Sequence, residues 1–167
     1  MAPTRRNRLF GWWSLLTWLS LGMVLEALHG FKIGWYLDVV NEARRLQLTL
    51  AHSHGTLLAL VNLGFAATVK GTPATAAQVG RASWCLRWAA MLMPVGFLGG
   101  GLFPMGPDPG FLVVLVPIGG LLLFVGVLHA ALVVRGEAGG VEAAPSEAPK
   151  APPVDPGKAT KPGKRGP

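Results

Sequence analysis

Charged residues are scarce in this sequence. Of its 167 residues, only 14% are Asp, Glu, Lys or Arg, whereas a soluble domain carries about 25%. Hydrophobic residues make up 51% of the chain, and the mean hydropathy is +0.44. This shortage of charge argues against a soluble globular domain and favours a membrane protein.

Cysteine and tyrosine each occur once, as Cys85 and Tyr36. A single cysteine excludes an intrachain disulfide, and we interpret Cys85 as a small apolar filler. The sequence contains no Gly-x-Ser-x-Gly element, phosphate-binding loop or dinucleotide fingerprint. Ser53 lies between two histidines, but neighbours in sequence do not face one another on a helix. We therefore expect no catalytic residues and a protein that is not an enzyme on its own.

Most of the hydrophobic residues fall into four long runs, which cover about residues 9–33, 46–69, 84–105 and 110–134. Each run has roughly the 20 residues that a helix needs to cross the hydrocarbon core of a bilayer. None alternates in the way that a barrel strand does. The sequence therefore predicts an all-α integral membrane protein, with residues 9–135 forming an up-down-up-down four-helix bundle.

The basic residues flank these runs and do not form one patch. We therefore exclude nucleic-acid binding, despite a net charge of +7. Lys and Arg dominate one set of loops, whereas Lys32, Arg44 and Arg45 on the other side are partly offset by acidic residues. By the positive-inside rule, both termini lie in the cytoplasm. We expect a multi-pass protein of a bacterial inner membrane, surrounded by lipid and assembled with further copies or into a larger complex.

Two segments fall outside the predicted bundle. Residues 1–8 form a basic N-terminal segment. Residues 136–167 are rich in Ala, Gly, Pro, Lys and Glu, with no aromatic residue. This composition is typical of a disordered tail.

Four ionisable residues interrupt the first two runs, namely Glu26, His29, His52 and His54. At 1.5 Å per residue from the outer ends of the runs, His29 and His52 lie roughly 6 Å deep, and Glu26 and His54 roughly 10 Å. Ionisable side chains inside a bilayer are costly and usually functional, and histidine is the commonest metal ligand. These four residues are therefore our candidate metal ligands.

His52 and His54 lie two positions apart, about 200° around a helix, so they point to opposite sides. This geometry suits two ligands, or one ligand and one partner. Arg44 and Arg45 lie about two turns above His52, and arginine binds carboxylates such as the propionates of haem. Our candidate cofactor is haem b, bound by His29, His52, His54, Arg44 and Arg45.

Residues 51–54, Ala-His-Ser-His, resemble the Ala-His-x-His motif in the catalytic subunit of the haem–copper oxidases. Residues 28–30, Leu-His-Gly, resemble the His-Gly element of that subunit. In that family, the two histidines of one helix serve two haems on its two sides. The resemblance implies that His29 and His54 are the axial ligands of a low-spin haem, and that His52 faces a second ligand site.

The chain departs from that family in its helix order, since the His-Gly helix directly precedes the His-x-His helix. Nothing matches the three-histidine copper site or its tyrosine, and Tyr36 falls in the outer loop. Small four-helix bacterial membrane proteins with a His-x-His second helix are similar too. The resemblance thus implies a reduced relative that holds haem, or a scaffold that has lost it.

Three functions stay open from the sequence. The first is a haem- or metal-binding membrane protein for electron transfer or sensing. The second is a non-catalytic structural or accessory subunit, in which the same residues form a buried polar network that fixes helix register. The third is a small proton- or ion-conducting protein, with Glu26 and the histidines as relay groups.

Overall fold

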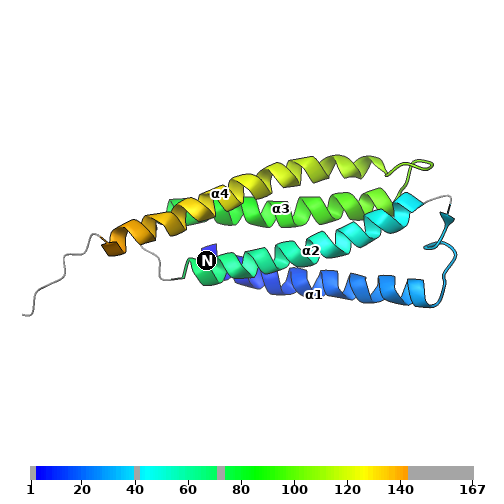
Figure 1. Ribbon diagram of the computed structural model, residues 1–167, viewed down its shortest axis with the longest axis horizontal. Helices are drawn as coiled ribbons and strands as arrows, with labels where there is room; N and C mark the ends of the chain where they lie inside the picture. Colours follow the sequence, from blue (N-terminus) through cyan, green and yellow to red (C-terminus); the bar gives the residue numbers. More distant parts are fainter. Residues whose placement is uncertain (1–2, 40–41, 71–73, 143–167) are drawn as a thin grey trace, which may run out of the picture.

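The structure, a computed structural model, describes residues 3–39, 42–70 and 74–142. Four long helices and one short 3-10 helix make up most of this part of the chain (Figure 1). They are α1 (Pro3–Gly30), α2 (Glu42–Thr68), α3 (Ala76–Leu102), η2 (Phe111–Val114) and α4 (Leu115–Glu142). The all-α class is as the sequence predicted.

The long helices lie in the order of the chain, each antiparallel to the one before (Figure 1). Each packs along the next helix in sequence, and α1 also touches α3 more lightly. Over the described ranges, α1 and α4 are the two edges and do not pack along one another. The alternating direction of the helices agrees with the prediction, but the helices form an open row and not a closed bundle.

A row of small residues brings α1 and α2 close together. Its members are all buried and follow one face of α2: Gly55, Ala59, Asn62 and Ala66. A Cβ atom added at Gly55 would lie only 2.2 Å from the ring of Trp18 on α1. The absence of that atom lets the indole lie directly on the α2 backbone, as expected for small residues at a helix contact.

A buried polar network ties α1, α2 and α3 together at the end that holds the N-terminus. Asn7 Nδ2 donates a hydrogen bond to Asn62 Oδ1 at 2.8 Å, and the Ser83 hydroxyl donates to Asn7 Oδ1. Asn62 Nδ2 donates to the carbonyl oxygens of Leu58 and Leu86, at 2.9 and 3.2 Å. Because each of these side chains is almost fully buried, the hydrogen bonds offset a desolvation cost that would otherwise oppose packing.

Helix α1 ends in a Schellman motif, the paired hydrogen bonds that close many helix C-termini. The Lys32 N–H donates to the His29 carbonyl, and the Ile33 N–H donates to the Leu28 carbonyl, both at 3.0 Å. Lys32 takes a left-handed conformation, with φ of 51°. This reversal sends the connector back along α1, so that Tyr36 packs with Leu25 and Leu48.

Helix boundaries differ from the predicted runs mainly at the end that holds the N-terminus. α3 begins at Ala76 and not near residue 84, because Thr75 and Gln78 form a capping box. α1 begins at Pro3, so most of the expected N-terminal segment 1–8 is helical. α4 continues to Glu142, past the expected end at 134. Hydropathy detects only the apolar part of a helix, whereas Arg, Glu and Ala extend it well. The rest of the expected tail, 143–167, lies outside the described residues.

The connection between α3 and η2 is a tight turn, as its prolines and glycines predict. Met105 and Asp108 exchange two backbone hydrogen bonds, of 2.9 and 3.2 Å. Gly106 inside this turn has a φ of 64°, which glycine adopts without strain. The Gly110 N–H donates to the Gly100 carbonyl at 2.9 Å. The turn therefore fixes where α4 starts against α3.

Three helical segments of the described chain are long and apolar enough to cross a membrane: Pro3–Gly30, Ala76–Leu102 and Phe111–Arg135. The sequence predicted four. α2 has 27 residues, but His52, Ser53, His54 and Asn62 lower its hydropathy. Large apolar side chains are exposed on the edge helices, such as Trp13 at 69% and Phe124 at 68%. α2, by contrast, lies between α1 and α3.

Candidate functional site

Two stripes of polar or small residues face each other where α1 meets α2. Their members are Gly22, Glu26 and His29 on α1, and Arg45, Thr49 and His52 on α2. Both stripes have the spacing i, i+4, i+7, which places residues on one face of a helix. Because the helices are antiparallel, the two stripes run past each other in opposite directions. The result is a polar strip between two otherwise apolar helices.

Two adjoining pockets open along this strip. The inner pocket has a volume of about 330 Å³ and is lined by Gly22, Leu25, Glu26, His29, Tyr36, Thr49 and His52. The outer pocket, nearer the α1–α2 connector, has a volume of about 670 Å³. Its lining is His29, Tyr36, Glu42, Ala43, Arg45, Leu46 and Thr49. Both volumes fall in the range of roughly 300–1,000 Å³ that small-molecule and cofactor sites occupy.

His52 is held against the backbone of α1. Its Nδ1 atom lies 2.8 Å from the carbonyl oxygen of Trp18, and a carbonyl oxygen can only accept a hydrogen bond, so Nδ1 carries the proton. In the neutral ring, Nε2 is then left with a free lone pair. A Cβ atom at Gly22 would lie 2.3 Å from Cε1 of this ring. Glycine at position 22 is therefore what lets the imidazole reach the α1 backbone.

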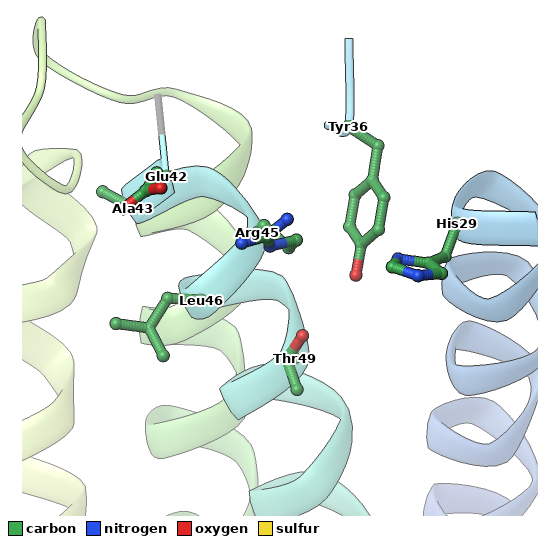
Figure 2. Close-up of a pocket in the computed structure, with 7 residues that line it drawn as sticks. All are labelled: His29, Tyr36, Glu42, Ala43, Arg45, Leu46 and Thr49. Carbon is green, nitrogen blue, oxygen red and sulfur yellow. The ribbon is translucent and has the colours of Figure 1, made fainter. Parts of the chain in front are cut away.

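Tyr36 forms the wall that the two pockets share. Its side chain is only 5% exposed, and Figure 2 shows the phenol standing between His29 of α1 and the α2 residues Arg45 and Thr49, with its hydroxyl directed into the space among them. The rings of Tyr36 and His29 meet edge to face, with centroids 6.5 Å apart. The sequence predicted Tyr36 in the outer loop, where the structure has it, but gave no sign that its side chain lines the candidate site.

His54 lies at a different interface. Its ring packs against Phe97 of α3, with centroids 4.8 Å apart, and its Nδ1 donates to the Leu50 carbonyl at 3.0 Å. The prediction that His52 and His54 point to opposite sides of α2 is confirmed, since one faces α1 and the other faces α3. His29 is on the α1–α2 pockets. The structure therefore does not bring together His29 and His54, the pair that the oxidase resemblance implies.

The two expected propionate partners also separate. Arg45 lines the outer pocket together with Glu42. Arg44 instead lies over the ring of Trp35, with Cζ 4.7 Å from the ring centroid, and donates to the Trp35 carbonyl at 2.8 Å. That contact fastens the connector to the first turn of α2. Arg45 remains available to an anionic group in the outer pocket, whereas Arg44 has a structural contact.

The four expected metal ligands do not form one cluster. In the part of the chain that the structure describes, no group of three or more His, Cys, Asp or Glu side chains lies close enough to hold a metal ion. Glu26, His29 and His52 line the inner pocket, but His54 does not. A haem iron needs only one or two protein ligands. The two pockets together present imidazole, phenol, guanidinium and carboxylate groups.

Sequence reasoning missed Gly22, Thr49 and Tyr36 as pocket residues. Gly22 and Thr49 could have been found by extending the i, i+4, i+7 spacing from His29 and His52 along each helix. Tyr36 gave no such signal, because its position depends on the Schellman turn at the end of α1.

Comparisons with protein-family models, with curated proteins and with solved structures found no match to this chain. The interpretation of the site therefore rests on its own geometry.

Proposed function

We propose that this chain is an integral membrane protein that binds haem b between α1 and α2, for electron transfer or sensing. The membrane part of the proposal is supported by three helical segments of sufficient length and hydropathy. α2 is as long as its neighbours and lies between α1 and α3. We therefore infer that all four helices, α1 to α4, cross the membrane. Both termini then lie on the side with more Lys and Arg, the cytoplasm.

The observation that carries the haem proposal is the hydrogen bond from His52 Nδ1 to the Trp18 carbonyl. Histidines that bind metals almost always donate their other ring N–H to a carbonyl or carboxylate, which fixes the tautomer and the ring orientation. His52 has this arrangement and lines the inner pocket. We propose that His52 would hold the haem iron through its Nε2 atom.

The neighbouring residues have roles that follow from their positions. His29 lines both pockets and would be a second iron ligand, so that His52 takes the place of His54 in the pair that the resemblance implied. Arg45 in the outer pocket would bind a propionate. The Tyr36 hydroxyl, which lies at the same level as Arg45, would donate a hydrogen bond to that propionate. Bound haem supplies one-electron redox chemistry or gas binding, and the protein sets its potential through the ligands and the surrounding polarity.

Visible spectroscopy tests this proposal directly. The full chain would be purified in mild detergent from a haem-competent bacterial host, and spectra recorded oxidised and after dithionite. We expect a Soret band, and sharp α and β bands on reduction. His52→Ala should abolish the bands, whereas His54→Ala, the matched control on the other face of α2, should retain them. Featureless spectra of the unmutated protein, with no metal by elemental analysis, would refute haem binding.

A second candidate function is an accessory subunit of a larger membrane complex. The open helix row favours it, because α1 and α4 leave apolar faces available to a neighbouring chain. In that case the polar residues of α2 serve only to hold the helices in register. Absence of haem, together with co-purification of a defined partner from the native membrane, would favour this candidate.

A further inference from the structure

Three cationic side chains come together at the end of the molecule opposite the candidate haem site. Arg5 and Arg8 on α1 and Lys70 just after α2 line one pocket with Thr4 and Ala66. Its volume is about 140 Å³. We call it the basic pocket.

The geometry of α1 and α2 forms this pocket. Arg5 and Arg8 are spaced i, i+3, so they share a face of α1. The antiparallel packing of the two helices brings the end of α2 to the start of α1 (Figure 1), and Lys70 lines the same pocket as Arg5 and Arg8. Ala66 is small and buried, which leaves room between the helices that a larger side chain would fill. Thr4 adds a hydroxyl group to the lining.

The charges in the basic pocket are all of one sign. None of the described residues that line it is a carboxylate, so the three cations repel one another without compensation inside the pocket. An anion would remove that repulsion. Arginine binds phosphate in a bidentate manner, and lysine binds it as a point charge. Water occupies about 30 Å³ per molecule in the liquid, so the pocket could hold about four waters; the bonded atoms of a phosphate group lie closer together than separate waters, and the group fits this space.

We propose that the basic pocket binds a phosphate group, carried by an anionic lipid headgroup or free in solution. A lipid source fits a pocket beside the apolar faces of α1 and α2 on the side expected to be cytoplasmic, where bilayers carry anionic lipids. This inference is independent of haem. Only its lipid arm rests on the proposed membrane insertion, and the free-phosphate arm does not.

The test is isothermal titration calorimetry of the full chain in uncharged detergent. The ligands are short-chain phosphatidylglycerol, short-chain phosphatidylcholine and inorganic phosphate. The pocket variant is Arg5→Gln with Arg8→Gln. The matched control is Arg81→Gln with Arg135→Gln, which removes the same charge from exposed positions on α3 and α4, away from the basic pocket. Circular dichroism verifies that both variants stay helical.

We expect phosphatidylglycerol to bind and phosphatidylcholine not to bind. One basic residue near an anionic lipid contributes about 1 kcal/mol, or about fivefold in affinity. The pocket variant should therefore bind about 25-fold more weakly, and the control within about threefold of the unmutated chain. Binding of inorganic phosphate with the same dependence on Arg5 and Arg8 would support the site and identify a free anion as the ligand. The proposal would be overturned if the two variants lost affinity equally, or if neither phosphatidylglycerol nor inorganic phosphate bound to the unmutated chain.

Discussion

The position of the His52 ring depends on the absence of a side chain at Gly22. The imidazole lies where any side chain at position 22 would be, and its Nδ1 reaches the Trp18 carbonyl only for that reason. A backbone carbonyl inside a helix usually accepts only from the N–H four residues later. Here it also accepts from a side chain of the neighbouring helix, which orients the proposed ligand.

Replacing Gly22 by alanine should therefore disturb the site without touching His52. The new Cβ would lie 2.3 Å from Cε1 of the ring, so the ring must move off the Trp18 carbonyl. Loss of such a supporting hydrogen bond typically weakens metal binding by about 10–100-fold. A haem titration monitored at the Soret band measures this loss of affinity. Gly30→Ala is the control, because a Cβ there meets no atom within 4 Å, and an equal effect of both changes would disprove the explanation.

Lys32 gives a prediction about stability. It is a non-glycine residue with φ of 51°, and the left-handed conformation costs such a residue about 1–2 kcal/mol. Lys32→Gly should raise the free energy of unfolding by about 0.5–1 kcal/mol, since glycine also loses more chain entropy on folding. Unfolding by dodecyl sulfate in mixed micelles measures it. Lys32→Ala removes the same charge but keeps the strain, so it should bring no gain.

The sequence could predict the residues of the site better than their pairing. The 200° separation of His52 and His54 follows from helix geometry alone, and their two interfaces agree with it. Which of them lies near His29 depends on which face of α2 packs on α1. The small residues that begin at Gly55 determine that face, because they lie on the same side of α2 as His52 and pack against α1. The same row was visible in the sequence, but the resemblance favoured His54.

At the scale of helices, the contacts between neighbouring helices depend on a few polar and small residues. Asn62 is the centre of the buried network and makes hydrogen bonds to α1, to α3 and to its own helix. Inside an apolar core such a group is stabilising only while all its partners are present. The network therefore fixes the register of three helices at one end, while the candidate haem site lies toward the other.

Asn62→Ala should destabilise the fold. The change leaves the Asn7 Nδ2 group without its acceptor in the core and removes one donor from the Leu86 carbonyl, and an unsatisfied buried group costs about 1–3 kcal/mol. Thr68→Ala on the same helix is the control, because the Thr68 side chain is exposed and bonds only within α2. That control should change the free energy of unfolding by less than about 0.5 kcal/mol. If Asn62→Ala is equally mild, the network does not hold the register.

Helix existence was predictable from long apolar runs, whereas helix ends were not. The runs located all four long helices, but α1 and α3 start well before the first apolar residue of each run. The capping box at Thr75 and Gln78 was present in the sequence and marks the start of α3. Apolar length alone could not reveal the open row either, because hydropathy does not say which faces meet.

For the whole molecule, the alternating helices put the start of α3 and the turn after α3 at opposite ends (Figure 1). Ala76 lies at the start of α3, and Met105 lies in the turn after α3. Both residues are exposed. On the proposed insertion, these positions are on opposite sides of the membrane.

Cysteine labelling tests that arrangement. Cys85 is buried and can be replaced by alanine to give a background without thiols. In intact cells, a membrane-impermeant maleimide should label Met105→Cys. Ala76→Cys should react only after the membrane is permeabilised. The reverse pattern would invert the orientation, and labelling of both in intact cells would contradict a membrane span between them.

On the proposed membrane insertion, the inner position of α2 has a consequence for biosynthesis. As α2 leaves the ribosome, its polar residues make it a poor candidate for entering lipid alone, since isolated polar groups in hydrocarbon are costly. Helix α1 has been made by then, and it supplies the Trp18 carbonyl for His52 and the Asn7 amide for Asn62. We therefore expect α1 to remain beside the translocon until α2 is made, and both helices to enter the bilayer together as a helical hairpin. The other face of α2 would stay in contact with the translocon until α3 emerges.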